Sequence, residues 1–585
     1  MKVKGLSGSA FGQLLQLLRP YRLQVFLALI LALLPAYFTL WTPAIVGRLI
    51  DDGLLARDQS ILLSLGLLVL GIKIVLFAMN SSVTYCMSAF GLQILVDYRD
   101  QLLRKVLTYP YSFFDKISSG SLTTRLTADI NSVQELFSSA LVPLIGNLFL
   151  AAGVVVAMFS IEWQLACLAL SVVPLLIWLT KSFDVRIRRR FGFMRKSLSS
   201  LNSFAGEMFS GHREIRVLNA RDAIETEFES HSRRLTNRNV QAVREYAIYN
   251  PIVPFITAIM DVMIVGYGGY QVYQGSMTVG VVVAFLGYSA IFAWPVRDFA
   301  EKYTVLQQAL ASVDRLVEIS NHSPEPDEGT LELSSPASFR VENLQFSYVG
   351  VESPAVRGLN FEVSAGQKIA LMGETGSGKT TTCSLLMRFY EPKSGRILLN
   401  GKDLRDYSLE SYRSSLGWVS QDVFLFSWTL RENLSFGSSI KDDEIWKVLE
   451  IVQLKDWVEN LPLQLNEVFV ERASLLSSGQ RQLLSLARAL LRRPRILIFD
   501  EATSYVDSLT EFMFQTALER IWKEDLLKDV TCFFIAHRLS TLRKCDRMLV
   551  FKAGEIVESG TYSELMANDG YAASLFASQF KKMAG

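Results

Sequence analysis

The sequence predicts a multi-domain membrane protein, in which an all-α domain of six transmembrane helices is followed by an α/β domain. The chain has 585 residues, which is too many for one hydrophobic core. Hydrophobic residues make up 50% of it, and charged residues are scarce in several long stretches before residue 300. Further along, short β-rich runs alternate with helical segments. We therefore expect a transmembrane domain over 1–320, a linker over 321–338 and an α/β domain over 339–585.

Six apolar stretches predict the transmembrane helices. A bilayer core about 30 Å thick requires roughly 20 mostly apolar helical residues. Stretches of this kind occur at residues 23–46, 61–90, 140–160, 163–180, 251–273 and 279–294. The first is too long for a removable signal peptide and lacks its small-residue cleavage site. We interpret it as the first membrane helix.

The links between these stretches predict the orientation of the chain. Long polar stretches separate the second span from the third and the fourth from the fifth. Both are basic, with Arg104 and Lys105 in one and Arg188 and Arg190 in the other, so the positive-inside rule places both in the cytoplasm together with the N-terminus and the α/β domain. We expect each stretch to continue the membrane helices as an amphipathic extension.

Bulk properties exclude other classes of protein. The net charge of +2 disfavours a nucleic-acid partner, because phosphate binding needs concentrated positive charge. The five cysteines are odd in number and widely spaced, which disfavours a disulfide framework or a zinc site.

The segment GETGSGKT (residues 373–380) has the context of a phosphate-binding loop, since it follows the β-rich run KIALM and precedes a helical segment. Glycines let backbone N–H groups converge on phosphate oxygens, and the helix N-terminus adds its partial positive charge. Lys379 is expected to reach the β and γ phosphates of ATP, and the Thr380 hydroxyl to ligate Mg²⁺. The predicted ATP-binding residues here are Gly373, Glu374, Thr375, Gly376, Ser377, Gly378, Lys379, Thr380 and Thr381.

An acidic pair follows the buried run ILIF in RILIFDEATS. Asp500 is expected to hold Mg²⁺ through water, and Glu501 to polarise the attacking water as general base. An acidic helix N-cap is the alternative, which the upstream phosphate loop disfavours. Gln421 and His537 also follow β-rich runs and can lie at the same edge of the sheet. A lone histidine is more often structural, but this position favours a functional role.

The order FSYVG, GETGSGKT, Gln421, LSSGQ, ILIFDE, SYVD and His537 resembles the nucleotide-binding domain of an ABC transporter. With six preceding membrane helices, the whole chain resembles a type IV exporter half-transporter, including FFDKISSGSLTTRLTADI at 113–130. The resemblance implies an ATP-hydrolysing exporter of a bacterial inner membrane, which dimerises and works by alternating access with ATP and Mg²⁺.

The resemblance also implies roles for single residues. Glu501 and His537 would be catalytic, with His537 contacting the γ-phosphate. Tyr348 would stack on adenine, and Gln421 would sense the γ-phosphate and, with Thr380 and Asp500, the metal. Asp507 would communicate between the two sites of a dimer. The family usually has SALD where this chain has SYVD, so Tyr505 and Val506 depart from the pattern and Asp507 keeps it.

In proteins that this chain resembles, two nucleotide-binding domains face each other head to tail, and each ATP lies between the phosphate loop of one and the LSSGQ of the other. Ser477, Ser478, Gly479 and Gln480 would therefore serve the partner's nucleotide, at the start of the helical segment RQLLSLARALL. The usual form is LSGGQ, and a serine in place of the first glycine adds a Cβ and restricts a backbone with positive φ. It is either a tolerated variant in a homodimer or the mark of a heterodimer whose partner lacks the catalytic glutamate. The expectation here is the heterodimer.

The transmembrane part leaves the substrate open among drugs, lipids and peptides. Lys73 and Asp261 lie inside predicted spans, where an ionised group is costly unless it faces protein, water or a partner. They either contact a polar substrate group or pair structurally. By resemblance, the tips of the extensions, near 118–122 and 211–219, dock on nucleotide-binding domains.

Two other functions compete with export. A membrane-anchored ABC ATPase with a regulatory role stays as the alternative. A soluble ABC protein of DNA repair or translation is excluded by six spans fused to one nucleotide-binding domain. The expected partners are a second half-transporter, the lipid bilayer and a small-molecule or lipid-like substrate, without nucleic acid.

Overall fold

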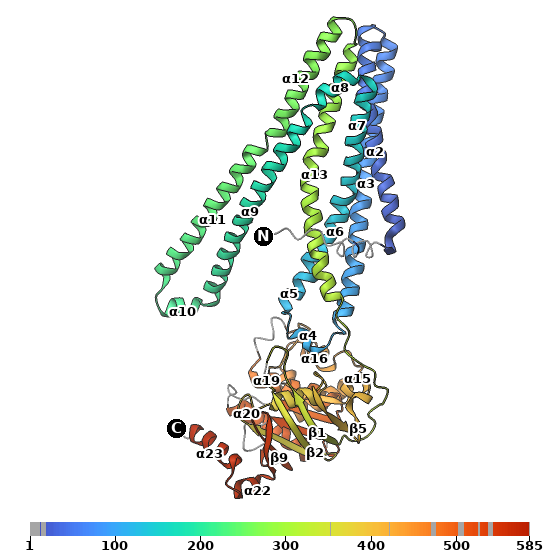
Figure 1. Ribbon diagram of the computed structural model, residues 1–585. Coiled ribbons are helices and arrows are strands. Elements are labelled where there is room, and N and C mark those ends of the chain that lie inside the picture. The colour runs from blue at the N-terminus through green and yellow to red at the C-terminus, as the bar shows by residue number, and fades with distance from the viewer. Residues whose placement is uncertain are drawn as a thin grey trace. The chain divides into compact units, whose positions relative to one another are not determined.

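The structure is a computed structural model that describes residues 12, 19–351, 353–420, 422–469, 476–500, 508–523, 527–535 and 542–583 (Figure 1). The chain divides into two compact units. We call Met1–Leu107 with Ser119–His322 the helical unit, and Thr108–Ser118 with Ser323–Gly585 the sheet unit.

The helical unit consists of long helices, several of which join end to end through wider π-helical turns at Leu49–Leu55, Arg125–Asp129 and Leu136–Leu141. Its α-helices are α2 (Arg22–Arg48), α3 (Gln59–Val106), α5 (Ser119–Thr124), α6 (Ile130–Glu135), α7 (Val142–Ile161), α8 (Trp163–Leu170), α9 (Val173–Ser210), α10 (His212–Val217), α11 (Arg221–Tyr249), α12 (Ile252–Tyr273) and α13 (Val279–Ser320).

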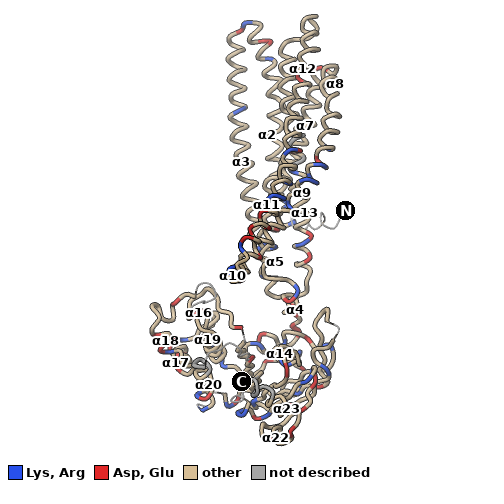
Figure 2. Tube along the Cα trace, turned by 90° about the vertical axis from the view of Figure 1, so that its left-hand side faces the viewer, with Lys and Arg blue, Asp and Glu red and all other residues tan. Residues whose placement is uncertain are grey.

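Five helical stretches of the described chain are long and apolar enough to cross a membrane, namely Arg19–Leu55, Gln59–Val106, Ser119–Ile161, Trp163–Ser210 and Arg221–Tyr273. A sixth, shorter apolar helix covers Val279–Pro295. Each predicted span falls in one of these six segments. Figure 2 shows charged residues on the lower parts of α9, α11 and α13. Of these, α9 and α11 form the extension between the fourth and fifth spans.

A capping carboxylate fixes the start of α3, and two glycines allow α2 and α13 to pack closely. Asp58 caps α3, because its Oδ1 accepts from the backbone N–H groups of Ser60 (2.9 Å) and Ile61 (3.2 Å). At Gly47 an added Cβ would lie 2.6 Å from the Gly280 carbonyl oxygen, so the two glycines let α2 and α13 touch. The Gly280 N–H donates to Asp51 Oδ1 at 2.7 Å. The extensions α9 and α11 run side by side and are joined by α10 (Figure 1).

The sheet unit contains two sheets. The six-stranded sheet has the order β10-β9-β3-β8-β7-β6, parallel except for β10, and the four-stranded antiparallel sheet has the order β2-β1-β4-β5. The strands are β1 (Phe339–Phe346), β2 (Val356–Val363), β3 (Lys368–Gly373), β4 (Ser394–Leu399), β5 (Lys402–Asp403), β6 (Leu416–Val419), β7 (Ile496–Asp500), β8 (Thr531–Ile535), β9 (Arg547–Lys552) and β10 (Glu555–Gly560).

Helices cover the parallel sheet, so its central strands are buried on both faces. Successive residues of β3 face opposite cores, with Ile369 and Leu371 in one cluster and Ala370 and Met372 in the other. The helices are α4 (Tyr111–Phe114), α14 (Lys379–Leu386), α15 (Leu409–Ser414), α16 (Leu430–Ser435), α17 (Asp442–Ile451), α18 (Lys455–Glu459), α19 (Ser478–Leu491), α20 (Ser508–Lys523), α22 (Tyr562–Ala567) and α23 (Tyr571–Met583).

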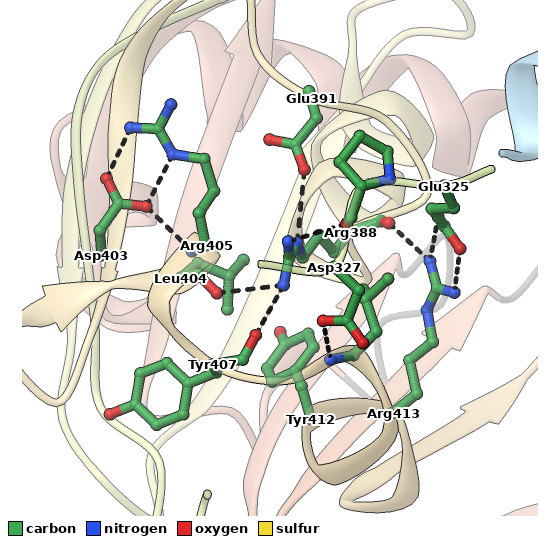
Figure 3. A network of polar contacts seen from close by, with 12 residues as sticks. Glu325, Asp327, Arg388, Glu391, Asp403, Leu404, Arg405, Tyr407, Tyr412 and Arg413 are labelled. Carbon is green, nitrogen blue, oxygen red and sulfur yellow. Dashed lines mark hydrogen bonds and ion pairs between the residues drawn. The ribbon is translucent and has the colours of Figure 1, made fainter. Parts of the chain in front are cut away.

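Part of the predicted linker is fastened to the sheet unit by arginines (Figure 3). Arg413 forms a two-pronged ion pair with Glu325, at 2.6 and 2.7 Å. The buried Arg388 donates to the carbonyl oxygens of Tyr407 (2.8 Å) and Pro326 (3.4 Å). Asp327 accepts from the Leu409 N–H at 2.9 Å. Residues 325–327 therefore belong structurally to the sheet unit.

The short helix α4 also packs within the sheet unit. The Tyr111 ring stacks on Phe389 with centroids 5.0 Å apart, and the Tyr390 hydroxyl donates to Asp115 Oδ2 at 2.6 Å. These contacting residues lie upstream of 118–122, where the tip of the first extension was expected. Ser118 falls in the sheet unit as well, and docking by the tip at 118–122 stays a prediction.

Candidate nucleotide-binding site

The loop after β3 takes a backbone conformation that requires glycine. Gly373, Gly376 and Gly378 have φ values of +152°, +82° and +104°. At Gly378, an added Cβ would also lie 2.7 Å from the carbonyl oxygen of Ala355. Gly378 directly precedes α14, so the loop ends at a helix N-terminus whose N–H groups are available to an anion.

Lys379 is folded back over this loop. Its ammonium group donates to the carbonyl oxygens of Gly373 (2.8 Å) and Glu374 (2.7 Å), and only 5% of the residue is exposed. Burial lowers the pKa of Lys379, while the charges of Asp500 and Glu374 oppose that shift. The Lys379 ammonium group is thus held against the loop by uncharged backbone carbonyl groups.

The other loop residues differ in exposure. Glu374, Thr375, Gly376 and Thr380 are exposed, whereas Ser377, Gly378 and Thr381 are buried. The Thr381 hydroxyl lies 3.1 Å from the Tyr348 hydroxyl. The half-buried Tyr348 ring makes edge-to-face contacts with Phe346 and Tyr390, at centroid distances of 5.0 and 5.4 Å. Tyr348 is thereby tied to the helix that follows the loop.

The parallel strands bring further predicted residues to the same edge of the sheet. β3, β8, β7 and β6 run in one direction, so their carboxyl ends lie together. Asp500 ends β7, and burial raises the pKa of its carboxyl group, which the charge of Lys379 partly offsets. Gln421, Glu501 and His537 follow the ends of β6, β7 and β8 closely in sequence, but they lie outside the described residues, as does Asp507.

The LSSGQ segment forms the start of α19. The Ser477 hydroxyl accepts from the Gln480 N–H at 3.1 Å, and Gln480 Oε1 accepts from the Ser477 N–H at 3.0 Å. This reciprocal pair is a capping box. Ser477 is exposed, Ser478 is half-buried and Gly479 is buried. The segment therefore presents a hydroxyl and the first turn of a helix to solvent.

The expected backbone restriction at Ser478 is wrong. Ser478 is the first residue of α19 and is not among the described residues with positive φ. A right-handed helical backbone accepts any L-residue, so the serine introduces no strain.

The two ionisable residues of the predicted spans differ in their surroundings. Asp261 on α12 accepts a hydrogen bond from the Ser289 hydroxyl on α13, and Ser289 is fully buried. This contact gives Asp261 a structural partner. Lys73 is exposed on α3, and the structure shows no hydrogen bond or ion pair for it within the described ranges.

Comparison with known proteins identifies the family. Residues 25–296 match the family described as ABC transporter transmembrane region, and residues 356–504 match the family described as ABC transporter. An uncharacterised ABC transporter ATP-binding protein of Bacillus subtilis is 33% identical over 576 residues, covering 97% of this chain and 94% of that protein. The chain belongs to the ABC transporter family.

Other relatives of this ABC transporter are named as flippases or exporters. An ATP-dependent lipid A-core flippase of Thiobacillus denitrificans is 31% identical over 98% of both chains, and one of Syntrophus aciditrophicus is 33% identical over 98% of this chain and 95% of that one. The structure of a bacterial Atm1-family ABC exporter with ATP bound has the same fold, with a TM-score of 0.78 at 24% identity, covering 95% of this chain and 98% of that one.

The chain is thus an ATP-driven ABC exporter half-transporter, and its ATPase activity is coupled to transport. A regulatory ABC ATPase is not favoured. The fused transmembrane region and the apolar helices make it a multi-pass membrane protein.

The geometry of the loop fits a nucleotide. Residues with a Cβ would be strained or would collide at Gly373, Gly376 and Gly378, so these glycines keep the loop open to phosphate groups. The buried Lys379 and Asp500 lie at the same edge of the sheet. ATP would supply the γ-phosphoryl group and Mg²⁺ the charge that balances it.

Proposed function

We propose that this exporter binds ATP with Mg²⁺ on the loop of residues 373–381 and hydrolyses it with Glu501 as general base. The observation that carries the proposal is the shared edge of β3, β6, β7 and β8, where the loop and Asp500 lie. Gln421, Glu501 and His537 follow the strands of this edge in sequence. Lys379 is poised to exchange the carbonyl groups of Gly373 and Glu374 for phosphate oxygens, which are stronger acceptors for an ammonium group.

The roles of the remaining site residues are part of the same proposal. Thr380 and Asp500 hold Mg²⁺ together with Gln421, and His537 contacts the γ-phosphate. Tyr348 stacks on adenine, a role supported by its bond to Thr381 beside the loop. Asp507 communicates between sites.

We further propose that the functional unit is a head-to-tail dimer, in which Ser477, Ser478, Gly479 and Gln480 serve the partner's nucleotide. The exposed Ser477 hydroxyl and the N-terminus of α19 support this, because both are suited to an anion from outside the chain. The exposed apolar side chains of Phe209, Val217 and Leu218 around α10 suit docking on a partner.

The partner is a second ABC half-transporter. The preference for a heterodimer rests on two departures from the usual family pattern: LSSGQ in place of LSGGQ, and GQRQLL (residues 479–484) in place of the commoner GQRQR. The comparisons do not favour a heterodimer over a homodimer. The decisive measurement is the ATPase activity of the chain purified alone. A dimer of this single chain with full activity would overturn the heterodimer.

The proposed substrate is a lipid-like amphiphile, exported from the cytoplasmic side of a bacterial inner membrane, with the nucleotide-binding domain in the cytoplasm. Its support is the relatives of 31% and 33% identity that are named lipid A-core flippases. Drugs and peptides are the competing classes.

Proteoliposomes containing the dimer test this function. We expect ATP-dependent movement of a fluorescent lipid, abolished in Glu501→Gln while ATP binding persists. Lys73→Gln, at an exposed position outside the sheet unit, serves as the control and should retain activity. Transport that survives in Glu501→Gln would refute the catalytic assignment.

A further inference from the structure

The helical unit contains a cavity of about 420 Å³ between α7, α9 and α13. Small-molecule sites are typically about 300–1,000 Å³ and mostly apolar, with a few polar groups that orient the ligand. This cavity has that character. Its apolar wall is formed by Leu148, Ala151, Ile177, Pro295, Phe299 and Tyr303.

One end of the cavity carries a positive charge without a partner. Lys181, Asp184 and Arg188 line it from α9. Asp184 is paired with Arg188 at 2.8 Å, and Arg188 also donates to Gln307 Oε1 at 2.9 Å. Lys181 has no hydrogen bond or ion pair to any described residue. Because the other two charges cancel, the wall keeps the single positive charge of Lys181.

A second polar group at the same end also lacks a partner. The Thr180 Oγ1 atom is buried and makes no hydrogen bond in the described part of the chain. Burying a hydroxyl without a hydrogen bond costs free energy, which a partner from outside the chain, such as a water, an ion or a ligand, would recover. Thr180 and Lys181 are adjacent and line one cavity, so an oxygen-rich anion would satisfy both.

The place of these residues in the sequence gives the orientation of the ligand. The apolar stretch of α9 ends at Thr180, and the basic extension begins at Lys181. The positive-inside rule puts this boundary on the cytoplasmic side. The wall residues Leu148 and Ile177 belong to apolar stretches that continue into the membrane. The cavity is thus charged at the headgroup level and apolar toward the bilayer.

We propose that this cavity is the cargo site and that it takes an amphiphile with an acidic headgroup, held by Lys181 and Thr180, and an apolar chain along the wall of α7 and α13. This inference rests on the proposed export function and deepens it. It assigns substrate contact to Lys181 in place of Lys73 and Asp261.

Binding to the full-length dimer in phosphatidylcholine nanodiscs, measured calorimetrically without nucleotide, tests the proposal. The probes share one chain and differ in headgroup: dodecyl phosphate, dodecyltrimethylammonium and dodecyl maltoside. We expect dodecyl phosphate to bind most tightly. Lys181→Gln should weaken its binding about tenfold or more, because a charge-assisted contact is lost, and leave dodecyl maltoside unchanged. Lys181→Arg should retain binding.

Two further variants separate binding from folding. Lys73→Gln removes a lysine that does not line the cavity and should have no effect on any probe. Thr180→Val should weaken dodecyl phosphate binding severalfold without lowering the melting temperature, because the hydroxyl has no described protein partner to lose.

Equal binding of the three probes, or unchanged binding in Lys181→Gln, would overturn the proposal. Competition by inorganic phosphate as strong as that by dodecyl phosphate would also overturn it, since it would indicate an anion site without a chain. Because no ATP is present, a failure of transport in proteoliposomes would leave this result intact and count against the proposed function alone.

Discussion

Gly378 is the position in the phosphate loop where a methyl group should do most harm. Its φ is +104°, and an added Cβ would lie 2.7 Å from the Ala355 carbonyl oxygen. A left-handed backbone costs a non-glycine residue roughly 1–2 kcal/mol, and overpacking costs about 1–3 kcal/mol. We therefore expect about 2–5 kcal/mol of strain in Gly378→Ala, which the loop can relieve only by leaving its anion-binding conformation.

The matched control is Gly376→Ala in the same loop. Gly376 has φ of +82°, but an added Cβ would meet no heavy atom within 4 Å, so only the backbone cost of roughly 1–2 kcal/mol remains. At 1.4 kcal/mol per tenfold, Gly378→Ala should weaken binding of a nonhydrolysable ATP analogue by at least about 30-fold, and Gly376→Ala by about tenfold. Equal losses of affinity in the two variants would refute the reasoning from the Ala355 contact.

Three further predictions concern single side chains. Ser478→Gly should change ATPase activity less than about twofold and destabilise the helix by at most about 1 kcal/mol, because Ser478 already has a helical backbone. A tenfold activation would contradict this expectation. Asp500→Asn should raise the melting temperature of the nucleotide-free protein at pH 7. The pKa of Asp500 is raised in the folded protein, so the ionised carboxylate makes the wild type less stable once the pH rises through that pKa. In acid, where Asp500 is protonated and neutral like asparagine, the difference in melting temperature between wild type and variant should vanish. A difference that grows in acid would contradict this. Asp261→Asn keeps an acceptor for Ser289 and should preserve lipid transport in proteoliposomes, whereas loss of transport would restore a substrate role.

Local patterns in the sequence were sufficient to predict the membrane spans and the loop expected to bind phosphate. The length of the apolar stretches predicts the spans, because the bilayer sets the number of helical residues required. GETGSGKT predicts a loop between strand and helix, and the structure has Gly373, Gly376 and Gly378 at the positive φ angles that only glycine adopts readily. These features depend on neighbours in sequence.

Features that depend on distant residues could not be predicted. Nothing near Tyr111 in sequence indicates that it stacks on Phe389, and nothing near Asp261 indicates Ser289 as its partner. The comparison of Ser478 with the usual glycine suggested strain, but the backbone angle is set by the capping box that starts α19. Nothing near Lys181 in sequence indicates that Leu148 and Phe299 line the same cavity.

The sequence by itself determined the membrane spans and the phosphate loop, because hydrophobic length and the loop motif are properties of contiguous segments. The function as an exporter came from the resemblance of the ordered motifs to ABC transporters. Only the tertiary structure decided which charges are left facing a cavity. A pair four residues apart on one helix, such as Asp184 with Arg188, can be read from the sequence. A cavity wall built from α7, α9 and α13 cannot, because its residues lie far apart along the chain and only packing brings them together.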